Sequence, residues 1–395
     1  MIAEKIRNDL GNSSWIRAMF EEGERLRQIH GTDKVYDFSL GNPDYEPAPR
    51  VQHLLRELVS GETPGLHRYT PNAGDVEARA RIAAAVAEDC GLPLGPEHIV
   101  MTCGAAGGLN VVLKAILNPG DEIIVLSPFF VEYLFYIDNH GGKSVVAPTT
   151  TGFEPDLETL DSAIGPRCRG IILNSPNNPT GVVYSQETLQ ALSILLEKKE
   201  KEFGTEILVI SDEPYSKLVY DDVKVTSVLK VFKNSVAVNS FSKSLALPGE
   251  RIGYIAVSPA INEVDMFING LVFANRTLGF VNAPSLFMKL VSMSLDEVPP
   301  VEEYKRRRDY FYDMLAGLGF KCTKPDGAFY LFPRSPLADD VEFVRRALKY
   351  NLLLVPGKGF GCPGYFRIAY CVSFDTIKNS QPAFEALAAE LNMRN

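Results

Sequence analysis

Five short clusters of polar, glycine and proline residues stand out in this sequence because their side chains could bind a ligand and act on it. They contain a glycine-rich turn, an asparagine loop, an aspartate, and a lysine followed by an arginine. The clusters are residues 102–108, 174–181, 211–215, 240–243 and 248–254. The set combines a possible amine nucleophile with groups that suit a phosphate.

The glycine-rich turn at residues 102–108 follows an apolar segment and precedes a helical one. Glycine lets the backbone approach a ligand closely, and free N–H groups at the start of a helix favour an anion. Gly104, Ala105 and Ala106 therefore predict a phosphate site, although the same residues also suit an ordinary tight turn.

Lys243 and Arg251 lie eight residues apart, and Ser240 and Ser242 come just before the lysine. A lone lysine is ordinarily a solvated charge. Beside hydroxyls, an arginine and a phosphate-type turn, Lys243 could instead be a nucleophilic amine. The planar fork of Arg251 matches the oxygens of a phosphate.

Asp212 ends an apolar segment, where a buried carboxylate is costly unless a cation or an N–H group pairs with it. The alternative is that Asp212 caps a following helix. The loop at residues 174–181 contains two prolines and one glycine. It suits either a rigid support for an asparagine side chain or a simple turn.

Short apolar segments alternate with helical ones in the middle of the chain. The expected strands are residues 99–102, 122–126, 170–173, 207–210, 236–239 and 252–257. Alternation of this kind predicts an α/β domain with a mostly parallel sheet, in which ligands bind beyond the carboxyl ends of the strands. Nearly every cluster named above directly follows one of these strands.

The two ends of the chain predict further helices. We expect one amphipathic helix at residues 12–31, capped by Ser13 or Ser14, and a long helical stretch at residues 261–296. Helices at residues 303–318 and 340–350 and an extended segment at residues 366–372 indicate a smaller α+β domain.

The composition is that of an ordinary globular protein, with 46% hydrophobic residues and a formal net charge of −9. An acidic chain argues against nucleic-acid and membrane partners, which need clustered lysine and arginine. The six cysteines form no CxxC pair and no metal-binding pattern with histidine, so no metal is expected. Scattered thiols and the lack of a visible signal peptide predict a cytoplasmic protein.

Together and in this order, the clusters resemble those of fold-type I pyridoxal-phosphate enzymes, and among them the class I/II (aspartate aminotransferase-like) aminotransferases. The resemblance runs from Ser14 to about Val372, and residues 240–253 are its most specific part. It implies a three-layer large domain with a mostly parallel seven-stranded sheet at residues 49–290. Residues 1–48 and 291–395 are then a smaller α+β domain that includes the N-terminal helix.

The resemblance also implies a cofactor, pyridoxal 5′-phosphate, held by Lys243 as a Schiff base. In this interpretation Asp212 pairs with the pyridinium nitrogen, Tyr215 and Asn178 contact the 3′ oxygen, and Phe130 stacks on the ring. The phosphate contacts implied are Ser240, Ser242, Arg251 and the backbone N–H groups of Gly104, Ala105 and Ala106. Tyr69 matches a residue that reaches the phosphate of a neighbouring subunit, which implies a homodimer with shared sites.

The implied reaction moves an amino group from an L-amino acid to a 2-oxo acid by a ping-pong mechanism. Gly41, Asn178 and Arg367 would bind the substrate, with Arg367 gripping its α-carboxylate through two hydrogen bonds. Lys243, Asp212 and Tyr215 are the expected catalytic residues. The freed amine of Lys243 would carry the proton, so no histidine is needed.

Three positions depart from the family pattern. Phe130 stands where many relatives have tryptophan or tyrosine, and Ala106 where some aspartate-preferring relatives have a basic or hydroxyl residue. Arg276 lies near the place where another group carries a carboxylate-reading arginine across the dimer, or it is a solvated surface residue. The amino donor therefore stays open among aspartate, alanine and hydrophobic or aromatic amino acids.

Two alternative functions remain. A pyridoxal-phosphate lyase, decarboxylase or ring-forming synthase could use Lys243 and Asp212 equally well. A cofactor-binding regulatory protein would need an attached DNA-binding module, and no basic helix-turn-helix pattern is visible.

Overall fold

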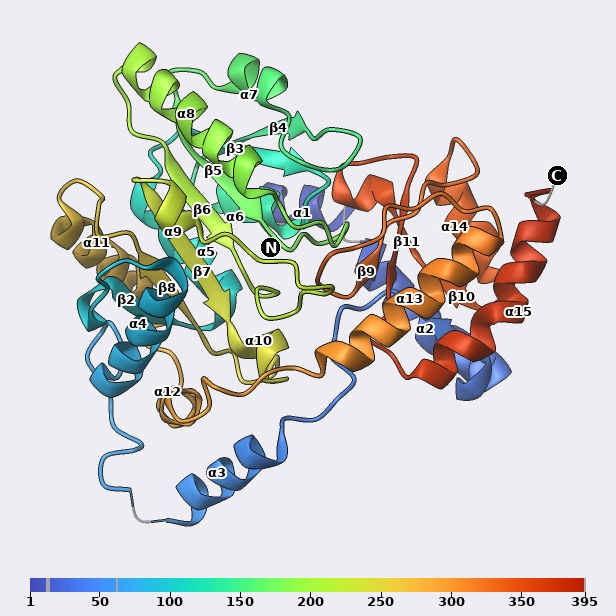
Figure 1. Ribbon diagram of the computed structural model, residues 1–395, viewed down its shortest axis with the longest axis horizontal. Helices are drawn as coiled ribbons and strands as arrows, with labels where there is room; N and C mark the ends of the chain where they lie inside the picture. Colours follow the sequence, from blue (N-terminus) through green and yellow to red (C-terminus); the bar gives the residue numbers. More distant parts are fainter. Residues whose placement is uncertain (12–14, 62, 394–395) are drawn as a thin grey trace.

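The computed structural model describes residues 1–11, 15–61 and 63–393. Its centre is a seven-stranded sheet (Figure 1) in which every neighbouring pair is parallel except those that involve β8. In spatial order the strands are β2 (Ile99–Thr102), β8 (Gly253–Val257), β7 (Ser235–Ser240), β6 (Leu208–Asp212), β5 (Cys168–Asn174), β3 (Glu122–Ser127) and β4 (Lys143–Pro148). This confirms the predicted α/β fold with a mostly parallel sheet.

Helices cover both faces of the sheet, which makes three layers (Figure 1). On one face, side chains of α5 (Gly104–Ile116), α6 (Glu132–Asn139) and α11 (Val264–Thr277) share a core with the strands. The other face packs against α4 (Val76–Cys90), α7 (Leu157–Ala163), α8 (Gln186–Phe203), α9 (Val228–Val231) and α12 (Ser285–Ser292). Because both faces are covered, the central strands read as continuous apolar runs rather than as alternating ones.

A smaller part, with orange and red helices at the right of Figure 1, has its own aromatic-rich core. It contains the antiparallel sheet β11 (Val355–Pro356), β12 (Phe366–Ala369) and β9 (Tyr330–Leu331), and the parallel pair β1 (Tyr36–Asp37) and β10 (Leu352–Leu353). Its helices are α13 (Val301–Gly317), α14 (Asp340–Leu348) and α15 (Phe374–Glu390). The division into residues 49–290 and residues 1–48 with 291–395 stays a prediction.

The N-terminal segment differs from the expected single helix. The structure has α1 (Glu4–Gly11) and α2 (Trp15–His30), and the predicted caps Ser13 and Ser14 lie outside the described residues. Met19 and Leu26 of α2 are buried against the smaller part of the molecule. α3 (Pro49–Ser60) follows and stands at the lower edge of Figure 1.

The expected helix at residues 261–296 was wrong as a single element, because the structure divides it into α11 and α12. Gly279 between them has a left-handed φ of 90°, and Pro284 precedes the first residue of α12. Both residues oppose a continuous helix, since proline lacks the N–H donor and glycine readily leaves the helical region. No strand was predicted at the edge strand β4, because its partly exposed residues do not alternate regularly between buried and exposed.

Among the described residues, no helix is long and apolar enough to cross a membrane.

Candidate active site

Most of the predicted site residues, all except Gly104 and Tyr69, meet in one cavity of about 310 Å³ at the carboxyl ends of β5, β6 and β7. This is the edge where an open parallel sheet is expected to bind its ligand. Those that line it are Gly41, Ala105, Ala106, Phe130, Asn178, Asp212, Tyr215, Ser240, Ser242, Lys243, Arg251 and Arg367. Segments more than 300 residues apart in the sequence therefore contribute to one cavity.

Lys243 lies in α10 (Phe241–Ser244), one short turn beyond the end of β7. Its Nζ donates a hydrogen bond to the carbonyl oxygen of Gly41 at 2.6 Å and lies 5.6 Å from the centre of the Phe329 ring. Burial disfavours the charged ammonium and lowers the pKa of Lys243 to about 8. Near neutral pH this amine is far easier to deprotonate than an ordinary lysine, as a nucleophile requires.

Asp212 is the last residue of β6, and its side chain is almost fully buried. Oδ2 accepts a hydrogen bond from the hydroxyl of Tyr133 at 2.6 Å, whereas Oδ1 has no hydrogen-bond partner among the described residues. Burial raises the pKa of Asp212 to about 6, against the opposing effect of the Tyr133 hydrogen bond. A buried carboxylate oxygen without a partner is costly, so this atom is suited to accept from a ligand N–H group. Asp212 does not cap a helix, because a non-helical turn follows it.

Asn174 joins two walls of the cavity. Its Nδ2 donates to the carbonyl oxygen of Asp212 at 2.8 Å, and its Oδ1 accepts from the backbone N–H of Asn178 at 2.7 Å. The loop at residues 174–181 is therefore anchored to the strand that carries Asp212, which places Asn178 firmly. A hydrogen bond of 2.8 Å joins the hydroxyls of Tyr215 and Tyr330 on the same side.

The glycine-rich turn begins α5 at Gly104, and no side-chain cap bonds to its first N–H groups. Gly104 has a left-handed φ of 72°, and a Cβ there would lie 2.7 Å from Nη2 of Arg251. Only glycine lets this turn take its conformation and lets the guanidinium come so close. Free N–H groups at a helix start beside an arginine form an anion site.

Arg367 comes from β12 and is 1% exposed. Nη1 donates to Oδ1 of Asn178 at 3.0 Å and Nη2 donates to the carbonyl oxygen of Ser39, while Nε finds no partner in the part of the chain that the structure describes. The guanidinium carbon lies 4.7 Å from the centres of the Tyr330 and Phe360 rings. No carboxylate is recorded against this guanidinium in the described chain, so it is a buried cation suited to an anionic ligand.

Two residues with predicted roles lie elsewhere. Tyr69 is 93% exposed and lies beside Phe280 and Asn282, outside the cavity of its own chain. Arg276 lies in the last turn of α11 at the surface, with its guanidinium carbon 5.3 Å from the centre of the Phe273 ring. A role for either residue at a site needs a second subunit.

Seven described residues that line the cavity were not predicted, namely Leu109, Tyr133, Tyr136, Asn174, Pro214, Pro248 and Tyr330. Tyr133 and Tyr330 hydrogen-bond to Asp212 and Tyr215, and Asn174 holds the loop that carries Asn178. Asn174 could have been predicted from the sequence, since it comes directly after the strand expected at residues 170–173. No local pattern marks Tyr330, because its partners are distant in the sequence.

A family model for aminotransferases of class I and II matches residues 33–380 of the chain. The chain belongs to this family. Its fold matches a crystal structure of an amino transferase from Eubacterium rectale with a TM-score of 0.96, at 41% identity over 99% of this chain and 100% of that one. The aspartate aminotransferase of Thermotoga maritima is 34% identical over 89% of this chain and 91% of its own. Aromatic-amino-acid aminotransferase 2 of Thermococcus litoralis is 28% identical over 97% and 98% of the two chains.

The protein is thus an aminotransferase of a family that uses pyridoxal 5′-phosphate, with amino acids and 2-oxo acids as its class of substrates. This confirms the resemblance stated from the sequence. It also selects transamination over the lyase and regulatory alternatives.

Proposed function

We propose that this aminotransferase binds pyridoxal 5′-phosphate covalently through Lys243 and exchanges amino groups between an L-amino acid and a 2-oxo acid. The observation that carries the proposal is the partnerless Oδ1 of Asp212. It lies in the same cavity as the buried amine of Lys243 and the buried guanidinium of Arg367. A pyridinium N–H group would satisfy this oxygen and keep the carboxylate charged.

The residues present fit the cofactor at each of its ends. Asp212 would face the ring nitrogen, Phe130 the ring, and Tyr215 with Asn178 the 3′ oxygen. Ser240, Ser242, Arg251 and the N-terminus of α5 would hold the phosphate. When bound, the cofactor supplies an electron sink for the electron pair left on the substrate's α-carbon.

The chain's own groups then have distinct tasks. Arg367 orients the substrate through its α-carboxylate, using N–H groups of the guanidinium that the described residues leave unpaired, among them Nε. The Lys243 amine, once free, takes the proton from the α-carbon, and positioned proton transfer of this kind typically contributes ~10²–10⁴-fold. Asp212 stays ionised throughout, so that the ring nitrogen stays protonated.

We also propose that the amino donor has an uncharged side chain, apolar or aromatic. Among the described residues that line the cavity, the charged ones are Asp212, Lys243, Arg251 and Arg367, and each already has a task. The remaining walls include Leu109, Phe130, Tyr136, Pro214 and Tyr330. A second carboxylate on the donor would meet no free cation there, and burying it unpaired is costly.

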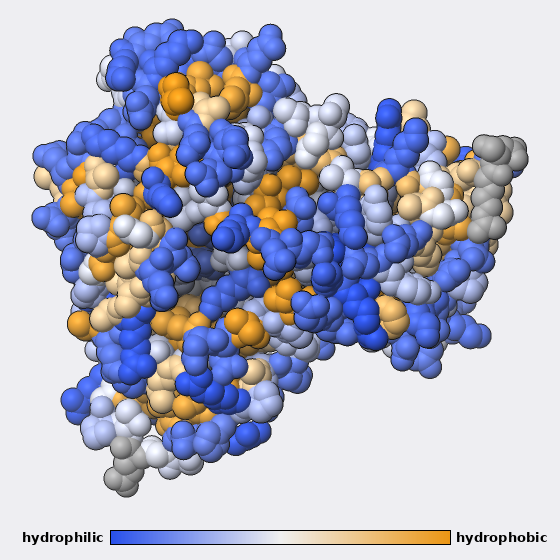
Figure 2. Space-filling model, viewed as in Figure 1, coloured by the Kyte–Doolittle hydropathy of each residue, from blue (hydrophilic) through white to orange (hydrophobic). Residues whose placement is uncertain are grey.

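We further propose that the protein is a homodimer in which each subunit contributes residues to the site of the other. Large apolar side chains are exposed on α3, on the segment after it, at the start of α4 and on α11, namely Val59, Tyr69, Val76, Met266 and Phe273. Figure 2 shows hydrophobic patches among hydrophilic ones around α3 and α12 at the lower left. Burial of such surface favours association, and Tyr69 would then reach the phosphate of the neighbouring subunit.

A donor panel with 2-oxoglutarate as acceptor tests the substrate, and Lys243→Ala tests the site. We expect phenylalanine, tyrosine and leucine to be used in preference to aspartate, and a yellow protein whose colour and turnover depend on Lys243. Preference for aspartate would overturn the uncharged donor and indicate a cation from the neighbouring subunit. Normal turnover by Lys243→Ala would remove Lys243 from its role.

A further inference from the structure

Residues 39–45, here called the active-site strap, contact both Lys243 and Arg367. The carbonyl oxygen of Gly41 accepts from Nζ of Lys243 at 2.6 Å, and that of Ser39 accepts from Nη2 of Arg367. The hydroxyl of Tyr45 donates to the backbone carbonyl oxygen of Lys243 at 2.6 Å. One short segment therefore sets the position of the amine relative to the guanidinium.

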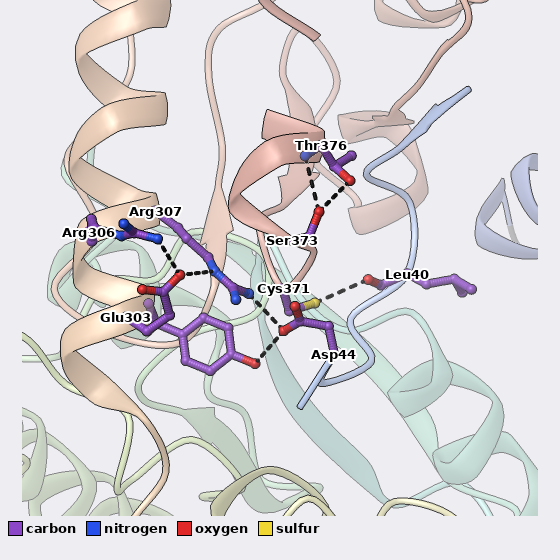
Figure 3. Close-up of polar contacts among 9 residues, drawn as sticks. Leu40, Asp44, Glu303, Arg306, Arg307, Cys371, Ser373 and Thr376 are labelled. Carbon is purple, nitrogen blue, oxygen red and sulfur yellow. Dashed lines mark hydrogen bonds and ion pairs between the residues drawn. The ribbon is translucent and has the colours of Figure 1, made fainter. Parts of the chain in front are cut away.

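The beginning of the strap is tied to the smaller part of the molecule. Oδ1 of Asp37 accepts from the N–H of Ser39 at 3.0 Å and from its hydroxyl at 2.6 Å. The thiol of Cys371 donates to the carbonyl oxygen of Leu40 at 3.4 Å (Figure 3). These contacts fix the backbone of Ser39 and Leu40, and the carbonyl oxygen of Ser39 is the one that accepts from Arg367.

The far end of the strap is held by an ion pair. Figure 3 shows Asp44 pointing toward Arg307 of α13, and Nη1 of Arg307 donates to Oδ1 of Asp44 at 2.7 Å. The hydroxyl of Tyr304 donates to the same oxygen at 3.4 Å. Tyr304 also packs edge-on against Tyr45, with ring centres 5.7 Å apart, so the pair and the Tyr45 contact form one unit.

Arg307 is well suited to hold this end. Its side chain is 10% exposed and that of Asp44 is 26% exposed, so water screens the pair less than it screens a surface pair. Nε of Arg307 donates to Glu303 at 3.1 Å, which fixes the plane of the guanidinium. Removing one partner leaves a half-buried charge without compensation, and the strap is then free to shift.

The strap has little room to shift without affecting the site. A Cβ built on Gly41 would lie 1.9 Å from the hydroxyl oxygen of Tyr330, which in turn bonds Tyr215. The backbone of Gly41 is therefore pressed against the cavity wall on one side and bonded to Lys243 on the other. A displacement at Asp44 should reach Gly41 and Tyr45 within a few residues.

We propose that Asp44 and Arg307 are positioning residues, which act through the strap to align Lys243 and Arg367 for proton transfer and carboxylate binding. This proposal rests on the proposed function, since it takes Lys243 as the catalytic amine. Neither residue lines the cavity, so neither touches substrate or cofactor. Misplacement of reacting groups by about 1 Å can cost about 100-fold in rate.

The test uses the cofactor-loaded enzyme. It compares three variants, namely Asp44→Asn, Arg307→Met and the double variant that carries both changes, with the control variant Arg306→Met. Arg306 is the matched control, because it lies on the same helix and donates to Glu303 at 2.9 Å but makes no recorded contact with Asp44. Rates are normalised to bound cofactor, so that partly loaded enzyme does not lower the apparent kcat. Thermal unfolding of each variant shows whether the fold is kept.

Each single variant should lose about 10- to 100-fold in kcat/KM, with kcat lowered and the donor KM raised. The kcat/KM of the double variant should be no lower than that of the less active single variant, because both changes remove the same ion pair. Arg306→Met should stay within about twofold of the parent. Asp44→Asn keeps nearly the same shape, so it provides the result even if Arg307→Met does not fold.

Two results would overturn the proposal: single variants whose normalised kcat/KM stays within twofold of the parent, or losses that simply multiply in the double variant. Lys243→Ala is measured alongside. If it is inactive while the strap variants are normal, only the positioning role fails. If it turns over, the proposed function itself fails.

Discussion

Asp212→Asn in the cofactor-free protein probes the cost of keeping a carboxylate ready for the cofactor. The carboxyl is buried, one oxygen has no partner, and its pKa is about 6 instead of 3.8. In the range between these two values, the folded state keeps the proton that the unfolded state has already lost. The free energy of unfolding of the parent protein therefore falls as the pH rises through this range.

The expected size follows from the shift of about two pKa units, at ~1.4 kcal/mol per unit. Asparagine does not titrate, so the free energy of unfolding of the variant does not fall with pH for this reason. The difference in free energy of unfolding, variant minus parent, should increase by about 3 kcal/mol in all, of which about 2.4 kcal/mol falls between pH 4 and pH 7. Titrating groups that do not interact with Asp212 cancel in the difference, and a constant offset from the amide does not affect the slope. The neighbouring Glu213 does not cancel fully, because burial and then the Asp212 charge raise its pKa to about 7; without that charge its pKa falls, which adds a smaller change of the same sign.

Urea unfolding of both cofactor-free proteins across this pH range measures the difference. Asp265→Asn, which changes an exposed carboxylate on α11, is the control, and its free energy of unfolding should stay within about 0.5 kcal/mol of the parent. A flat difference for Asp212→Asn would refute the reasoning, because the carboxyl would then carry no burial cost. With cofactor present, the same variant should lose at least about 100-fold in turnover, because an amide does not stabilise a protonated ring nitrogen.

Three further outcomes are expected. Tyr133→Phe removes the hydrogen bond that lowers the pKa of Asp212, so the pH midpoint in the same unfolding series should move above 6; an unchanged midpoint would contradict the contact. The rate of cofactor binding to the cofactor-free protein, followed by absorbance, should rise as the pH passes about 8, where Lys243 loses its proton; a rise delayed to pH 10 would indicate an ordinary lysine. Arg367→Ala should raise the donor KM about 10- to 100-fold, as loss of a charged hydrogen bond does. Its cofactor affinity should stay within about threefold, and an unchanged KM would remove Arg367 from substrate binding.

Much of the fold followed from local patterns. β2 begins and ends at the predicted residues, and the other five predicted strands were each located to within two residues. Buried parallel strands are short, continuous apolar runs that need no distant information. The edge strand β4 was missed because half-exposed strands carry a weaker signal. The break before α12 was missed although Gly279 and Pro284 mark it in the sequence.

The site residues were predicted from the motifs that occur together in the sequence. Lys243 and Asp212 come at the carboxyl ends of neighbouring parallel strands, which must lie at one edge of the sheet, so their proximity was predictable in principle. Arg251 instead precedes β8, and only the antiparallel direction of β8 brings it to the same edge. Arg367 and Gly41 were named through the family resemblance, because no spacing relates them to Lys243. Both do line the same cavity, while their roles stay a proposal.

The sequence by itself determined which chemical groups are present and that a parallel sheet would gather them. Only the tertiary structure decided how those groups are tuned. Burial sets the pKa of Lys243 to about 8 and that of Asp212 to about 6. The partners Tyr133, Tyr330 and the Asp44–Arg307 pair come from distant segments. Desolvation and long-range hydrogen bonds depend on what surrounds a residue in space, which no local pattern encodes.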